Sequence, residues 1–183
     1  MRRKEKTPVF AHEERRFYVF RFPVSRKQPR GGISLGVTTM PAEHRIDDTA
    51  GLIITTWEGA AVDIELIEAI QKYQDEIQLN PAYIDYNEVV DFRAATSIKL
   101  TPRGIQSLGT VAVKTDKHKR QSRLAIVVGS NLAFNLARLY VTYRNLGKNS
   151  NKEIRIFKNG QEAQEWAESA SIRTSGNEHA KSR

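Results

Sequence analysis

The most regular hydrophobic pattern in the chain lies between residues 123 and 147. Leu124 to Val128 form an uninterrupted apolar run, which is typical of a strand that is covered on both faces. Gly129 breaks the run, and either Ser130 or Asn131 is suited to cap the first amides of a helix. Apolar side chains then recur at steps of three and four residues, as expected for an amphipathic helix that stops at a glycine: Leu132, Leu136, Leu139, Tyr143 and Leu146.

The same pattern analysis predicts further strands and helices on both sides of this segment. Strands are expected at 44–47, 52–57, 86–92 and 153–157, and helices at 63–77, from 102 onward, and from 160 to about 170. Asp63, Thr101 and Asn159 are the residues expected at the helix starts. The order ββαβαβαβα predicts an α/β fold with a mixed, mostly parallel sheet of about five strands. The first two strands form a hairpin, and helices flank the sheet.

The compact part of the chain is expected to be one domain that spans residues 40–170, because the pattern becomes regular at Met40. Residues 1–39 form a basic extension that is predicted to be disordered, although Phe17 to Phe20 has the composition of a short strand. The extension is either an appendage of the domain or the product of a start codon upstream of Met40. Residues 171–183 are polar and are predicted to be a disordered tail.

Composition narrows the chemistry that the chain can carry. Its 183 residues include no cysteine, which excludes disulfides and thiolate metal sites. The formal charge is +8, but residues 1–40 carry +7 and residues 41–170 carry −1, so the basic character belongs to the ends. Such an arm either binds nucleic acid without sequence preference or is a solvated tail. No apolar stretch is long enough for a membrane span, and we expect a cytoplasmic protein.

Five segments of the sequence together resemble the small bacterial SpoIIAA-like proteins, also described as STAS/SEC14-type domains. They fall within residues 40–168 and read MPAEHRID, GLIITTWEG, EVVDFRAAT, RLAIVVGSNLAFNLARLY and IRIFKNGQEAQEWA. The most characteristic part is the ending, where Phe157 shortly precedes Ala163 and Trp166. Because these are core positions, the resemblance implies a fold, a mixed sheet with helices packed against it, more than it implies a function.

The resemblance also has implications for phosphorylation and for ligands. In the anti-sigma-factor antagonists of this fold, a serine after the third strand is phosphorylated by a partner kinase. Phe92 occupies that position here, so no phosphorylation site is carried over. Thr96 or Ser97 could take the role loosely, or could serve as capping and loop residues. Other proteins of this type bind lipids or other apolar molecules in an internal pocket. No residue of this sequence requires such a pocket.

No catalytic constellation is recognisable in the sequence. The four histidines are not paired at metal-ligand spacing, and we predict neither a metal nor a cofactor. Ser130 follows a strand and opens a helix, but Val128 and Leu132 stand where a nucleophile elbow has glycines. We therefore expect a protein that is not an enzyme.

Candidate ligand-binding residues gather where two strands are expected to end. Asp91 ends one strand, and Gly129, Ser130 and Asn131 follow the next strand along the chain. In a parallel sheet both ends lie at the edge where α/β proteins bind ligands, and free helix amides there attract anions. The alternative is an ordinary strand-to-helix turn, with Asp91 capping its own loop.

A basic connection, which includes Lys117, Lys119 and Arg120, either contacts phosphate or an acidic partner or is a solvated loop.

Three functions are consistent with the features of the whole sequence. The first is a non-enzymatic regulatory or protein-interaction module of the SpoIIAA-like type, with another protein as its partner. The second is a carrier or sensor of a small apolar or anionic ligand. The third is nucleic-acid contact through the N-terminal arm. The sequence does not indicate an oligomeric state.

Overall fold

The computed structural model describes residues 17–23, 39–114, 121–146 and 151–169. The strands are β1 (Phe17–Pro23), β2 (Thr39–Asp47), β3 (Leu52–Trp57), β4 (Gly59–Val62), β5 (Asn87–Asp91), β6 (Ala95–Lys99), β7 (Ser122–Val127) and β8 (Lys152–Phe157). The helices are α1 (Asp63–Tyr73), α2 (Pro102–Val113), α3 (Asn131–Leu146) and α4 (Gly160–Glu168). A π-helical segment (Gln74–Gln78) directly continues α1.

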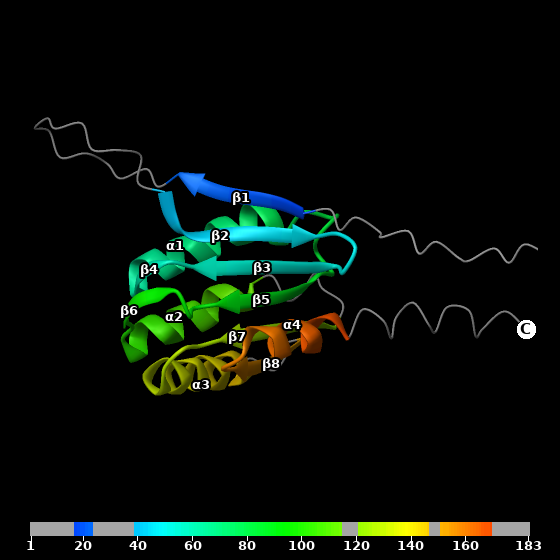
Figure 1. Cartoon of the computed structure of the whole chain (residues 1–183). Helices are drawn as coiled ribbons and strands as arrows, with labels where there is room; N and C mark the ends of the chain where they lie inside the picture. Colours follow the sequence, from blue (N-terminus) through cyan, green and yellow to red (C-terminus); the bar gives the residue numbers. More distant parts are fainter. Residues whose placement is uncertain (1–16, 24–38, 115–120, 147–150, 170–183) are drawn as a thin grey trace, which may run out of the picture.

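The main sheet has the strand order β1-β2-β3-β5-β7-β8 (Figure 1). The first three strands pair antiparallel, and β3, β5, β7 and β8 pair parallel. This arrangement confirms the mixed, mostly parallel sheet and the hairpin that the element order predicts. Asp47 stabilises the hairpin turn, because its Oδ1 accepts a hydrogen bond from the N–H of Ala50 at 3.0 Å. The next residue, Gly51, has a φ of 59°, a conformation that favours glycine.

β1 adds a sixth strand beyond the five expected. It confirms the short strand suggested by the aromatic composition of Phe17 to Phe20, and it departs from the disorder predicted for the whole N-terminal extension. Its register pairs Phe17 with Asp47 and Phe20 with His44, so it covers the open edge of β2. An unpaired strand edge offers a row of backbone donors and acceptors, which explains why this segment pairs there.

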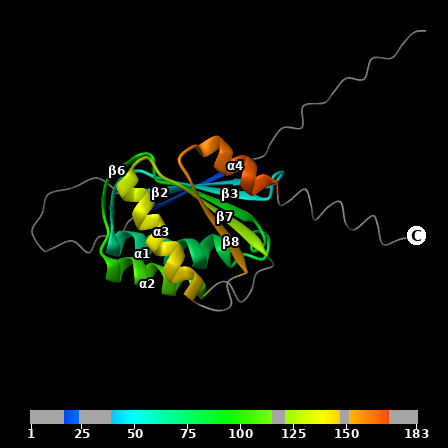
Figure 2. The ribbon, with the colours of Figure 1, turned by 90° about the horizontal axis from the view of Figure 1, so that it is seen from below.

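The sheet lies between two unequal layers of helices. Figure 2 shows α1, α2 and α3 on one face and α4 alone on the other. Successive side chains of β7 and the residue after it point to opposite faces of the sheet. Leu124, Ile126 and Val128 pack toward α3, while Ala125 and Val127 pack toward α4. The sheet is therefore covered on both faces around β7, as its uninterrupted apolar sequence predicts.

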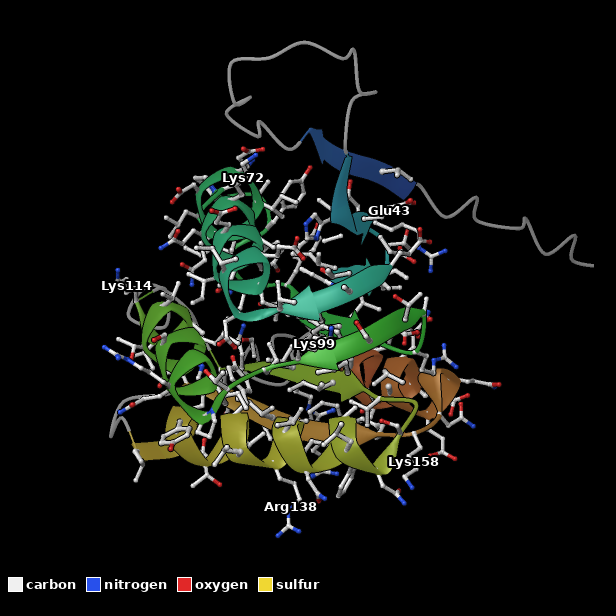
Figure 3. The ribbon with its side chains drawn as sticks, turned by 90° about the vertical axis from the view of Figure 1, so that its left-hand side faces the viewer. Glu43, Lys72, Lys99, Lys114, Arg138 and Lys158 are labelled. Carbon is white, nitrogen blue, oxygen red and sulfur yellow. The ribbon has the colours of Figure 1, made fainter. Side chains whose placement is uncertain are left out.

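A short second sheet of β4 and β6 lies beside the main one, and the two strands pair parallel. Figure 3 looks at this end of the molecule and shows Lys99, on β6, near its centre. The sequence analysis did not predict these two strands, because both are short and neither alternates clearly between apolar and polar residues. Their position closes the layer between the sheet and the helices at the carboxyl ends of the parallel strands.

The start of α1 differs from the expectation. Val62 is the N-cap residue and makes no side-chain capping bond, so Asp63 does not cap its own helix. The Asp63 carboxylate instead accepts hydrogen bonds from the backbone N–H and the hydroxyl of Thr101, at 3.0 and 2.6 Å. Thr101 caps α2, as predicted, by accepting from the N–H of Gly104. Asp63 thus ties the start of α1 to the start of α2.

The face of α3 that contacts the sheet also differs from the predicted one. Leu132 and Leu146 are 61% and 71% exposed, whereas Ala133, Ala137 and Arg144 are buried. Small alanine side chains let the helix approach β7 closely, and the larger leucines near the helix ends face solvent. Leu136, Leu139 and Tyr143 of the predicted stripe are half-buried. Alanine contributes little to a hydrophobic pattern, so the pattern of large apolar residues identified only part of the buried face.

Asn87 connects three elements at the other end of the sheet. Its Nδ2 donates to the carbonyl oxygen of Ala167 on α4 at 3.0 Å, and its Oδ1 accepts from the backbone N–H of Arg123 on β7 at 2.8 Å. The side chain is buried, so no water can replace either bond.

We expect Asn87→Ala to lower the free energy of unfolding by about 3 kcal/mol, because two partly or fully buried backbone groups lose their partner. Asn80→Ala is the matched control, since Asn80 is exposed and its side chain accepts one hydrogen bond, from the N–H of Ala82. The control should cost less than about 1 kcal/mol. Urea unfolding of both variants measures the difference, and equal losses would contradict the role given to Asn87.

Candidate functional site

Two of the four residues predicted to bind a ligand at the strand ends, Asp91 and Gly129, lie against Arg93. Asp91 ends β5 and forms an ion pair with Arg93, with 2.7 Å between Oδ2 and Nη2. The Asp91 carboxylate also accepts a hydrogen bond from the Arg93 backbone N–H at 2.9 Å. Gly129 lies against Arg93, since a Cβ built on the glycine would be 3.7 Å from the Arg93 Cα.

The other two predicted ligand residues make structural contacts at the same edge. Ser130 caps α3, because its Oγ accepts a hydrogen bond from the N–H of Ala133 at 3.1 Å. Asn131 accepts a hydrogen bond from Nζ of Lys158 at 2.9 Å. Lys158 is labelled at this edge in Figure 3. A ligand-binding role for these residues stays a prediction.

The remaining residues singled out in the sequence fall elsewhere. Thr96 and Ser97 belong to β6, where Ser97 pairs with Ala60. Phe92, the residue that the sequence resemblance set against a phosphorylated serine, packs against Trp57 with 6.0 Å between the ring centroids. The basic-contact residues Lys117, Lys119 and Arg120 lie outside the described residues.

A cavity of about 150 Å³ lies between the sheet and the layer of α1, α2 and α3. It was not predicted from the sequence. One end, near the carboxyl ends of the parallel strands, has apolar walls that include Trp57 of β3, Ile98 of β6 and Leu108 of α2. The opposite end, near the start of β5 and β8, is lined by polar and charged side chains: His44, Thr55, Tyr73, Gln74, Gln78, Glu88, Arg144 and Lys152.

Glu88 is the centre of the polar end. It forms a buried ion pair and hydrogen bond with Nζ of Lys152, which reaches it from β8 across the intervening strand β7. Oε1 of the same carboxylate accepts a hydrogen bond from Nε2 of Gln78 at 3.1 Å. Burial, with a further effect of the Glu88 charge and hydrogen bonding, raises the pKa of Tyr73 well above its ordinary value. Tyr73 is therefore a neutral phenol at physiological pH.

The π-helical segment places two glutamine side chains at this end. Its wider turn is closed by a hydrogen bond from the N–H of Leu79 to the carbonyl oxygen of Gln74, five residues earlier. Gln74 and Gln78 are both buried. Gln74 donates to the carbonyl oxygen of Val111 on α2 at 3.0 Å, while Gln78 reaches Glu88. The segment thus contributes two polar side chains to the cavity wall, and π-helical turns are frequent at functional sites.

His44 lies in the floor of the cavity on β2. Its Nδ1 is 2.8 Å from Oγ1 of Thr55 on the paired position of β3, and its ring stacks on Tyr73 with 5.2 Å between centroids. Burial lowers the pKa of His44 to about 4, against an opposing effect of the Glu88 carboxylate. The imidazole is therefore neutral at pH 7 and adds no charge to the cavity.

Strand periodicity contained a signal for this cluster. Glu88, Val90 and Phe92 alternate along β5, and Lys152, Ile154 and Ile156 alternate along β8, so one charge occupies an inward position on each strand. A charge on an inward face is rare unless it is paired. Neither charge was singled out from the sequence: Glu88 lay within the strand expected at 86–92, and Lys152 lay one residue before the strand expected at 153–157.

Metal binding and the crossing of a membrane are two further properties that side chains and helices of the described residues could support. Across the described part of the chain, no three His, Asp or Glu side chains come close enough to hold a metal ion. None of the helices described is both long and apolar enough to cross a lipid bilayer.

No protein-family model and no curated protein matches the sequence. Among solved structures, the chain is similar to an uncharacterized protein of the DUF3478 family with a SpoIIAA-like fold from Shewanella loihica PV-4. The sequence identity is 13%, the alignment covers 63% of this chain and 83% of the other, and the TM-score is 0.42. A likeness of this extent supports no statement about function, and the α/β fold follows from the order and pairing of the strands themselves.

The lowered pKa of His44 predicts a specific loss of stability in acid. In the unfolded chain a histidine titrates near 6.5, whereas in the fold His44 titrates at about 4. The unfolded state therefore binds more protons between these values, and the free energy of unfolding falls as the pH drops below 6.5. Between pH 7 and pH 5 we expect His44 to account for a loss of about 2 kcal/mol.

Urea unfolding of the natural protein and of His44→Gln at both pH values measures this contribution. The other histidines are common to both proteins, so the variant should lose about 2 kcal/mol less over the same interval. An equal loss in the two proteins would show that His44 does not titrate as its burial requires.

Proposed function

We propose that this protein binds a small, largely apolar molecule with one polar end inside the central cavity. It acts as a carrier or sensor of that molecule and does not catalyse a reaction. The observation that supports the proposal is the cavity itself, about 150 Å³ in volume, with apolar walls at one end and buried charges at the other. An engineered cavity of similar volume accommodates a benzene molecule, which sets the scale of the ligand.

The size of the cavity favours an occupant. Protein interiors are closely packed and contain few voids larger than a water molecule. At about 24 cal/mol per Å³, an empty cavity of this volume would lower stability by roughly 4 kcal/mol. Native domains are stable by only about 5–15 kcal/mol, so such a loss is a large fraction of the total. A ligand that fills the space restores the missing contacts.

The polar end of the cavity also favours a binding role. A core selected for stability alone gains little from a buried ion pair, because the desolvation of the two charges offsets much of their attraction. The Glu88–Lys152 pair nevertheless lies between the sheet and the helices and faces the cavity. Charges in this position give a ligand a fixed orientation, with its polar group at one end and its apolar body at the other.

The protein-interaction module predicted from the sequence is compatible with this function. A sensor must pass on its state of occupancy, and a partner protein is one way to do so. No particular surface among the described residues favours a partner, and Phe92, the residue that the sequence resemblance set against a phosphorylated serine, packs on Trp57. The module therefore stays a prediction, and ligand binding is the function that the geometry supports best.

Toluene is a suitable first probe, because its size matches a cavity that holds a benzene ring. Trp57 lines the cavity, whereas Trp166 packs beside Phe157 on the α4 side of the sheet. In a Trp166→Phe protein, which keeps an aromatic ring there, tryptophan fluorescence reports on Trp57 alone. We expect toluene to change this fluorescence saturably and to raise the melting temperature by about 3 °C or more.

Two variants locate the binding. Ala137→Leu and Ala69→Leu each add three carbons to a buried position in the cavity wall, on α3 and on α1. Ala60→Leu makes the same change at an exposed position of β4. The wall variants should abolish the response to toluene, and the surface variant should keep it. No response in the natural protein, or an undiminished one in both wall variants, would refute the proposed function.

A further inference from the structure

We propose that the ligand is a monocarboxylate with a compact apolar body, and that its carboxylate binds at Arg144 and Lys152. This inference rests on the proposed function and specifies the chemistry of the ligand. It follows from three features of the cavity: the balance of its charges, the placement of Arg144 and the small volume available.

The described lining of the cavity carries more positive than negative charge. Arg144 and Lys152 are cationic, and Glu88 is the carboxylate among the described lining residues. His44 adds no charge at pH 7, because burial lowers its pKa to about 4. Within this lining an anionic ligand group meets two cationic side chains and one carboxylate, so the described side chains attract it more than they repel it.

Arg144 is placed to meet such an anion. It is only 2% exposed, and it follows Ala133, Ala137 and Tyr140 on the side of α3 that lines the cavity. The planar guanidinium presents a fork of donors that matches the two oxygens of a carboxylate. Arg144 also interacts with other groups of the protein, so the ligand shares this side chain with them.

Lys152 provides a second donor at the same end. Its Nζ already contacts Glu88, and an ammonium group has three hydrogens that can be directed to different acceptors. Glu88 also receives the hydrogen bond from Gln78. A ligand carboxylate that contacts Lys152 and Arg144 therefore extends the polar cluster without displacing the Glu88–Lys152 pair.

The volume limits the apolar body of the ligand. About 150 Å³ accommodates a ring or a short chain of roughly six to ten non-hydrogen atoms. Two long acyl chains would not fit in a space of this size. The apolar end, lined by Trp57 and Ile98 among others, suits an aromatic ring or a short aliphatic chain. Benzoate and hexanoate represent these two alternatives.

Calorimetric titration of the natural protein tests the charge preference directly, without any substitution. Benzoate, benzamide and benzylamine have nearly the same shape and carry a negative, a neutral and a positive group. We expect benzoate to bind at least tenfold more tightly than benzamide, and benzylamine not to bind measurably. Hexanoate compared with hexanamide repeats the test with an aliphatic body, and a preference for the carboxylate in either pair supports the inference.

Two substitutions of opposite effect assign the preference to the cavity. Arg144→Met keeps an unbranched side chain and removes the charge, so the preference of benzoate over benzamide should fall to less than threefold. Glu88→Gln removes the negative charge with little change of shape, so benzoate should bind several-fold more tightly. Ala137→Leu should abolish benzoate binding altogether, which places the anion inside the cavity.

The outcomes separate this inference from the function on which it rests. If the neutral amides bind as tightly as the carboxylates while toluene binding depends on the cavity wall, the carboxylate is refuted and the binding function stands. A benzoate preference that persists unchanged in Arg144→Met and Glu88→Gln would also refute the inference. If toluene and all the isosteres fail to bind, the proposed function itself fails.

Discussion

The ion pair between Glu88 and Lys152 determines what the interior of this protein can hold. It joins β5 to β8 across β7, inside a layer where the neighbouring inward positions are apolar. A buried pair of this kind is tolerated only when both charges are present and further hydrogen bonds satisfy them. The rest of the polar cluster meets that condition, with Gln78 on the carboxylate and Tyr73 kept neutral beside it.

The helices that cover the sheet place polar side chains near the buried Glu88–Lys152 pair. α1 passes into a π-helical segment near the ion pair, and Gln74 and Gln78 of this segment are buried and line the cavity. α3 approaches the sheet with alanines and then presents Arg144 at its far end. The alanines of α3 are too small to fill the layer between helix and sheet, which leaves room for the cavity. Gln74, Gln78 and Arg144 make one end of this cavity polar.

The sequence predicted the framework of the fold better than its interior. Uninterrupted or alternating apolar runs identified β3, β5, β7 and β8, and Thr101 and Asn159 were correctly placed at the starts of α2 and α4. Such local signals depend on backbone geometry over a few residues. The pairing of β1 with β2 and the short β4–β6 sheet depend on edges supplied by distant segments, which local patterns do not reveal.

The candidate site was harder to predict, for a related reason. The sequence analysis looked for ligand residues at the carboxyl ends of the strands, where Asp91 and Ser130 are held by contacts within the protein. The cavity lies inside the sheet–helix layer, and its charged end is at the opposite end of the strands. Glu88 and Lys152 are 64 residues apart, and only the strand order brings them together. A single charge on an inward strand position indicates burial but not its partner.

The cavity also affects the molar volume of the folded protein. An unoccupied space inside the fold is lost when the chain unfolds, so the unfolded state occupies less volume, typically by about 20–100 mL/mol. Hydrostatic pressure shifts an equilibrium toward the smaller volume. The empty protein loses a cavity of about 150 Å³ when it unfolds, so pressure favours its unfolding. A molecule bound between the helices and the sheet fills that volume, and the bound protein therefore resists unfolding by pressure.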